Sequence, residues 1–161
     1  MTCQHKILTL RGLNLLLGLL VIGACQAGES SVSSATAAGA SEKPKESRMW
    51  MTINERRFAI TLADNDTARA FAAQLPLTLH MEELNGNEKH AKLPISLPAH
   101  ASRPGTIRNG DLMLYGTDTL VVFYSTFNSM YSYTRIGRVD DTAGLAEALG
   151  PRSAQIAFSG P

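Results

Sequence analysis

The chain has 161 residues, 44% of them hydrophobic, and a formal net charge of +1. This length suits one domain with appendages and is too short for two ordinary domains. The nearly balanced charge offers no basic field for a polyanion, so we expect no nucleic-acid partner.

Residues 1–24 have the pattern of a lipoprotein signal peptide. Two basic residues, Lys6 and Arg11, precede a short apolar run at 13–22. Residues 22–25, IGAC, match the bacterial lipobox, in which Cys25 is lipidated and becomes the first mature residue. A plain secretory signal that happens to contain a cysteine is the alternative. An aspartate directly after the lipidated cysteine is the usual signal for retention in the inner membrane. Gln26 stands at that position instead, so we expect an outer-membrane lipoprotein facing the periplasm.

Residues 25–48 are rich in Ser, Ala, Gly, Glu and Lys and contain no aromatic residue. Such a segment buries too little apolar surface to offset the entropy of ordering it, which predicts a flexible tether. The cysteines of the chain are Cys3 and Cys25. One would be discarded and the other lipidated, so the domain at 49–161 would be stabilised by its core without a disulfide.

The first part of the domain predicts a hairpin, a helix and a third strand. Short strand-like runs at 49–53 and 57–62 flank a turn. Apolar residues at helical spacing then follow a capping cluster at 64–66, and Pro76 ends that helix. Residues 77–84 alternate between apolar and polar, as in a half-buried strand.

A metal site can be considered on this third strand. His80 and Glu82 share its polar face, and His90 lies just past the turn at 85–87. Structural zinc requires four well-spaced ligands, and no cysteine or dense histidine cluster is present in the domain. A solvated strand face accounts for the same residues, so we expect no metal.

Prolines prevent residues 93–98 from forming a central strand, and 100–108 has the character of an exposed loop. Two continuous apolar runs, 112–115 and 120–124, then predict a central hairpin covered on both faces. A loop at 125–134 mixes aromatics with hydroxyls. A strand at 135–139, a helix at 143–149 capped by residues 140–142, and a closing strand at 154–158 complete the chain.

In their order and spacing, several segments resemble the small bacterial cyclophilin-like domain family. The segments are LPL at 75–77, NGDL at 109–112, FY at 123–124, YTRIGR at 133–138 and GL at 144–145. The resemblance implies a mainly β fold, a closed barrel of about eight strands with two short helices. This agrees with the strands predicted by patterning.

The resemblance does not extend to the motif of prolyl isomerases. Cyclophilins that isomerise prolyl bonds use an arginine in a Phe-His-Arg strand, together with a glutamine and aromatics. Here the segment 133–136 is the only echo of that motif, and its histidine is replaced. Fold likeness alone does not transfer activity. The chain also lacks a glycine-rich phosphate loop and a hydrolase nucleophile motif, so we expect no catalytic residue and no cofactor.

The aromatic loop and its flanks are the candidate binding surface. Aromatics with polar tips, adaptable hydroxyls and a planar guanidinium are enriched at recognition surfaces. The candidate residues are Tyr124, Phe127, Ser129, Tyr131, Tyr133 and Arg135. In the alternative, the aromatics only pack on the barrel and Arg135 pairs with Asp111.

The sequence therefore predicts a lipid-anchored, monomeric envelope protein whose barrel binds a small molecule or a protein. Two alternatives remain open. One is a weak peptidyl-prolyl isomerase or another small-substrate enzyme that uses Arg135. The other is a partner module of a flavodoxin-like redox protein, which a bound flavin would reveal.

Overall fold

The computed structural model describes residues 47–161; the predicted signal peptide, Cys25 and nearly all of the tether lie outside this range. Eight antiparallel strands close into a barrel in the order β1-β10-β3-β4-β7-β6-β9-β2, and β5 and β8 form a separate sheet. The barrel strands are β1 (Arg48–Ile53), β2 (Arg56–Leu62), β3 (Leu77–Leu84), β4 (Glu88–Lys92), β6 (Asp111–Tyr115), β7 (Thr119–Phe123), β9 (Thr134–Val139) and β10 (Ala154–Ser159). The predicted fold class is confirmed.

The N-terminal hairpin and the first helix form largely as predicted. The β1–β2 turn places Asn54 in the left-handed region, with φ of 53°. Helix α1 (Asp66–Ala72) is capped by Asn65, whose side chain accepts a hydrogen bond from the Ala68 amide. It ends before the predicted position near Pro76, and its Phe71 packs edge-on against Phe158 of the barrel core.

The β6–β7 hairpin is covered on both faces, as its continuous apolar runs predicted. Leu112, Leu114, Leu120 and Val122 face the barrel interior and belong to the main hydrophobic core. The hairpin residues that alternate with these, Met113, Val121 and Phe123, face outward. Together with residues of neighbouring segments they form a second hydrophobic cluster, here called the outer core. It consists of Ile107, Met113, Val121, Phe123, Tyr133 and Phe127.

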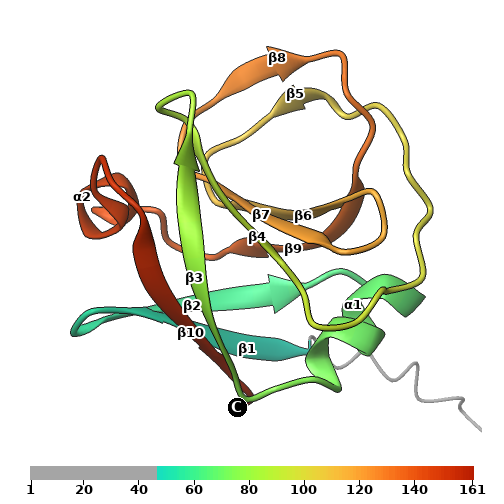
Figure 1. The fold of residues 1–161 in the computed structure, drawn as a ribbon, viewed down its shortest axis with the longest axis horizontal. Helices are drawn as coiled ribbons and strands as arrows, with labels where there is room; N and C mark the ends of the chain where they lie inside the picture. The colour runs from blue at the N-terminus through green and yellow to red at the C-terminus, as the bar shows by residue number, and fades with distance from the viewer. Residues whose placement is uncertain (1–46) are drawn as a thin grey trace, which may run out of the picture. The chain divides into compact units, whose positions relative to one another are not determined.

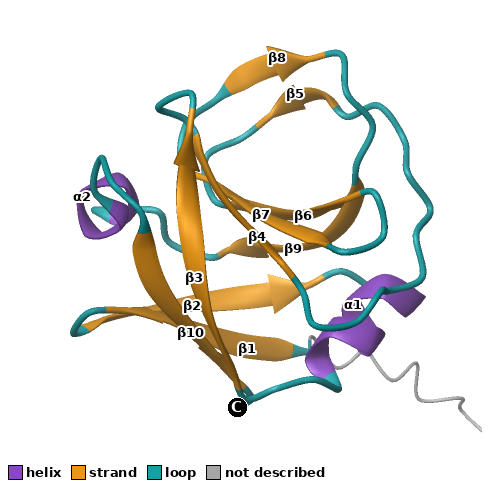
Figure 2. Ribbon diagram, viewed as in Figure 1, coloured by secondary structure: helices purple, strands orange, loops and turns teal. Residues whose placement is uncertain are grey.

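The outer core is covered by a small sheet that the sequence did not predict. Strands β5 (Gly105–Ile107) and β8 (Phe127–Ser129) pair with each other and lie over β6 and β7, outside the barrel (Figures 1 and 2). We expected loops at 100–108 and 125–134. Both loops instead contain a three-residue strand, too short and too polar to show a hydrophobic period.

Two further elements differ from the prediction. Strand β4 was not predicted, because its sequence EKHAK lacks apolar alternation. Helix α2 (Leu145–Leu149) begins later than expected, after Gly144 with φ of 69°, and no side chain caps it. Asp141 instead accepts a hydrogen bond from the Ala143 amide in the preceding turn. Helices α1 and α2 lie on opposite sides of the barrel (Figure 1).

Residues 93–98 form no strand, in line with their prolines. Leu93 and Leu97 nevertheless anchor this segment by packing into the barrel core. Within residues 47–161, neither helix has the length and apolar character needed to cross a membrane.

Candidate functional site

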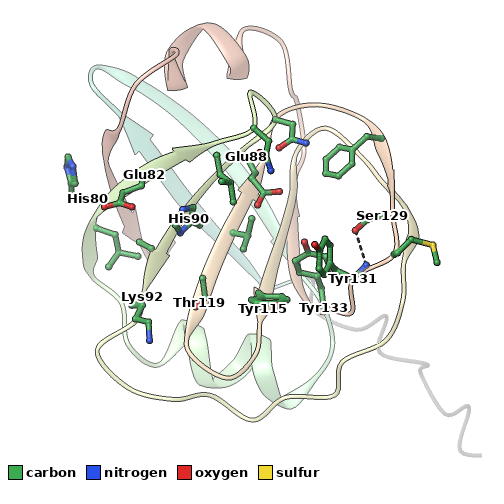
Figure 3. A pocket seen from close by; sticks show the side chains of 18 of the residues that line it. His80, Glu82, Glu88, His90, Lys92, Tyr115, Thr119, Ser129, Tyr131 and Tyr133 are labelled. Carbon is green, nitrogen blue, oxygen red and sulfur yellow. Dashed lines mark hydrogen bonds between the residues drawn. The ribbon is translucent and has the colours of Figure 1, made fainter.

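A pocket of about 1220 Å³ lies between the outer surface of the barrel and the β5–β8 sheet. Strands β3, β4 and β7 form the barrel side, and β8 with the residues after it forms the opposite side. Figure 3 shows the pocket from close by, with charged side chains toward one end and tyrosines toward the other.

Aromatic rings line the end of the pocket next to the outer core. Tyr115 contacts Tyr133 with ring centroids 5.6 Å apart, and it meets Tyr131 edge-on at 6.3 Å. Tyr133 also packs edge-on against Phe123, so the aromatic cluster continues into the outer core. A rigid wall of this kind offers apolar surface and ring faces to a ligand.

The rim of the pocket exposes large apolar side chains to solvent. Within the described residues, five large hydrophobic side chains are exposed, and four of them line this pocket: Leu84, Tyr115, Met130 and Tyr131. The fifth, Ile95, lies elsewhere. Exposed apolar groups that gather around one concavity are typical of a binding surface.

One acidic side chain lies deep in the pocket. Glu88, the first residue of β4, is only 8% exposed, and its side chain lines the pocket (Figure 3). Burial raises the pKa of Glu88 above its ordinary value, and the neighbouring Glu83 carboxylate raises it further. Burial likewise raises the pKa of Tyr133, with a contribution from Glu88.

The residues considered for a metal site also lie at this pocket. His90 pairs with Glu82 across the β3–β4 ladder, and His80 is on the same face of β3. Within residues 47–161 no three His, Cys, Asp or Glu side chains gather closely enough to hold a metal ion. These three side chains therefore form a polar edge of the pocket.

The neighbour of Glu88 on the same strand points the opposite way, into the end of the barrel. Lys89 is fully buried, and its Nζ donates to Glu83 and to the carbonyl oxygens of Gly150 (2.7 Å) and Arg152 (2.6 Å). Tyr124 also donates to Glu83, at 2.7 Å. Burial acts to raise the pKa of Glu83, but these donors and the Gly86 amide hold it below its ordinary value.

The structure brings four of the six candidate binding residues to the pocket: Phe127, Ser129, Tyr131 and Tyr133. Tyr131 is 65% exposed at the rim, whereas Tyr133 is 7% exposed in the wall. Ser129 accepts a hydrogen bond from the Tyr131 amide and holds the end of β8 (Figure 3). Tyr124 is not part of the group, because its hydroxyl belongs to the Glu83–Lys89 contacts at the barrel end.

Arg135 does not join the tyrosines either. Its side chain donates to the buried carboxylate of Asp111 at 2.9 Å, the pairing that the packing alternative described. Asp111 also accepts from the Arg108 amide, so it joins the β5–β6 turn to β9. Arg135 lines a smaller hollow between β2 and β9. Arg135 and the tyrosines of the aromatic loop therefore line different hollows.

Sequence reasoning missed Glu88 as a pocket residue. The sequence did contain a signal for this residue. The charged pair Glu88-Lys89 directly follows the turn at 85–87, and that turn follows the amphipathic strand at 77–84. Such a return strand is expected to pair with β3, and side-chain alternation then places its two charges on opposite faces.

The fold and the pocket together define a closed β-barrel with a lateral site covered by a small second sheet. The chain belongs to the cyclophilin-like family, whose model matches residues 51–159. Among solved structures, it is similar to the solution structure of the hypothetical protein AF2241 from Archaeoglobus fulgidus. That match has a TM-score of 0.53 and 14% identity, and covers 75% of this chain and 99% of the other. This likeness supports the fold alone. No curated protein matches the chain.

Proposed function

We propose that the protein is a lipid-anchored envelope protein whose barrel binds a small organic molecule in the lateral pocket. The observation that carries the proposal is the gathering of exposed apolar side chains at the rim: four of the five found in the described residues surround this one concavity. Apolar groups exposed without a partner cost free energy in water, and a bound ligand would cover them.

The construction of the pocket supports a small molecule. Small-molecule sites are concave, mostly apolar and supplied with a few polar groups that fix orientation. Here tyrosines and aliphatic side chains form the walls, and Glu88 provides a buried polar group. The volume of about 1220 Å³ is somewhat above the usual range for such sites, which leaves room for a ligand with an apolar body.

The neutral dye Nile red tests the pocket directly. The purified protein should enhance its fluorescence, and the double substitution Tyr131→Ala with Met130→Ala should reduce this enhancement while leaving the melting temperature nearly unchanged. Ile95→Ala is the matched control, because Ile95 is 56% exposed and does not line the pocket. Equal dye binding by the double variant and the control would contradict the proposal.

Native mass spectrometry of the protein purified from cell envelopes would identify a retained ligand. A retained small molecule that is lost from the same double variant supports the proposal. A retained flavin would instead favour the redox-partner alternative.

The anchor is tested separately. Cys25→Ala should abolish incorporation of labelled palmitate and release the domain from the membrane fraction without altering its melting temperature. Palmitate on the Cys25→Ala protein would contradict lipidation at this residue.

A further inference from the structure

Two hydrogen-bond acceptors in the pocket lack donors. Glu88 is 92% buried as a residue, and within residues 47–161 its carboxylate has no hydrogen-bond or ion-pair partner; its oxygen atoms are not fully enclosed, so they remain accessible from the pocket. Asn87, the preceding residue, also lines the pocket; its Oδ1 atom is buried and has no donor among the described residues. Leaving buried acceptors unpaired is costly, and side chains in this state are uncommon in folded domains. The Glu88 carboxylate is the acceptor that a donor from outside the chain can reach, because the Asn87 Oδ1 atom has almost no accessible surface.

The lysines nearest in sequence are engaged elsewhere. Lys89 points into the barrel end, where it contacts Glu83 and two carbonyl oxygens. Lys92 lines the pocket but pairs with Asp118 at 3.2 Å. Glu82 adds a second carboxylate at the pocket edge, so the lining has an excess of negative charge when its histidines are neutral.

The aromatic wall matches the same ligand chemistry. Tyr115 and Tyr133 are in ring contact and line the pocket together with Glu88. Ring faces attract organic cations, and the attraction strengthens when water is excluded. A carboxylate beside tyrosines thus favours a cationic group carried on an apolar body over an anion or a neutral polar ligand.

We propose that the ligand is an organic cation whose ammonium or guanidinium group donates to Glu88, with its apolar body against Tyr115 and Tyr133. This inference rests on the proposed function, since it specifies the ligand class of the same pocket. A primary ammonium has three donors and a guanidinium has five, so either can donate to both oxygens of the Glu88 carboxylate at once.

Three probes of similar shape and different charge test the inference: phenethylamine, 2-phenylethanol and 3-phenylpropionate. By calorimetry, phenethylamine should bind the purified protein most tightly and 3-phenylpropionate most weakly. Glu88→Gln should weaken phenethylamine binding by about ten- to a hundredfold, the loss expected for a hydrogen bond to a charged group. Binding of 2-phenylethanol should be unchanged, which shows that the variant pocket is intact.

Glu55→Gln is the matched control, because it removes the same charge from the exposed β1–β2 turn, outside the pocket. Its affinity for phenethylamine should equal that of the wild type. The melting temperature of Glu88→Gln should not fall, because the substitution removes an unpaired buried carboxylate. A marked fall would show that Glu88 stabilises the fold and would overturn the inference.

The outcomes separate this inference from the proposed function. If all three probes bind equally and Tyr131→Ala weakens all of them, the pocket binds ligands without selecting cations, and only the inference fails. If neither Nile red nor any probe binds, both fail. N-acetyl-lysine methylamide, which carries a lysine side chain between two amide groups, distinguishes the source of the cation. If it binds as tightly as phenethylamine, the cation is a lysine side chain of a polypeptide. If it binds more weakly, the cation is a free amine.

Discussion

Glu83 and Glu88 lie five residues apart, on strands that pair with each other, yet their hydrogen-bond partners differ. At the barrel end, Glu83 accepts hydrogen bonds from Lys89, Tyr124 and the Gly86 amide. In the lateral pocket, Glu88 is more deeply buried and has no donor among the described residues. A network whose members are all satisfied stabilises a fold, whereas a carboxylate that faces a pocket without a donor from its own chain is available to a ligand.

The largest expected effect comes from removing the cation at the barrel end. Lys89→Met should lower the free energy of unfolding by about 3 to 5 kcal/mol, because it breaks a buried ion pair and leaves the Gly150 and Arg152 carbonyls without their donor. Urea denaturation of the variant measures this loss. A loss in the free energy of unfolding below about 1 kcal/mol would contradict this prediction. It would mean that the polar groups at the barrel end do not need Lys89 as a partner.

Next in size is a truncation on the pocket side. Phe123→Ala should cost about 2 to 5 kcal/mol, because Phe123 is fully buried and packs against both Phe127 and Tyr133. The same variant should lose Nile red binding, since these contacts hold the wall of the pocket. Unchanged dye binding at reduced stability would show that the aromatic wall does not depend on the outer core.

The Tyr124 hydroxyl is the third test of the comparison. Tyr124→Phe removes one donor from Glu83 and keeps the ring, so it should cost about 1.5 to 3 kcal/mol, the range for a hydrogen bond to a charged group. Binding of the three probes should be unaffected, because Tyr124 does not line the pocket. Loss of binding in this variant would link the two regions that the structure separates.

The smallest expected effect is on the pH dependence of stability, and it has opposite signs for the two carboxyls. The lowered pKa of Glu83 stabilises the fold above the ordinary carboxyl pKa, and this contribution is lost as the pH falls through the folded-state value. The raised pKa of Glu88 stabilises the fold below the ordinary value, and this contribution is lost as the pH rises through the folded-state value.

The difference in melting temperature between Glu88→Gln and the wild type should therefore grow as the pH rises above the ordinary glutamate pKa of about 4.3. The charged groups near Glu88, including Glu82, Glu83, His90 and Lys92, remain in both proteins, so the difference isolates Glu88. A difference that stays constant with pH would contradict the raised pKa.

The sequence was sufficient to predict most of the barrel. Alternation in β3, the continuous apolar runs of β6 and β7, and the capping residue Asn65 each report on local backbone geometry and burial. Strand β4 could not be found in this way, because its sequence lacks apolar alternation and its buried lysine is accounted for only by tertiary partners. The β5–β8 sheet was missed since its strands have only three residues each and depend on Phe123 and Ile107 for cohesion.

The candidate site was predicted in part. Aromatics interleaved with hydroxyls indicated the segment around Tyr131 and Tyr133, which does line the pocket. The pairing of Arg135 with Asp111 was one of two alternatives, and local composition could not decide between them; nor could it show that Tyr124 reaches Glu83 across 41 positions of sequence. The opposite wall, from β3 and β4, joins the site only through barrel closure.

Closure of the barrel also affects how the molecule behaves among its own copies. An open sheet presents rows of unpaired backbone amides and carbonyls, onto which a second chain can add its own strand. In residues 47–161 all eight strands of the barrel have neighbours on both sides, and the only sheet with free edges is β5–β8, whose strands have three residues each. Crowding on a surface or at high concentration therefore offers little template for strand addition and amyloid-like assembly of the folded domain.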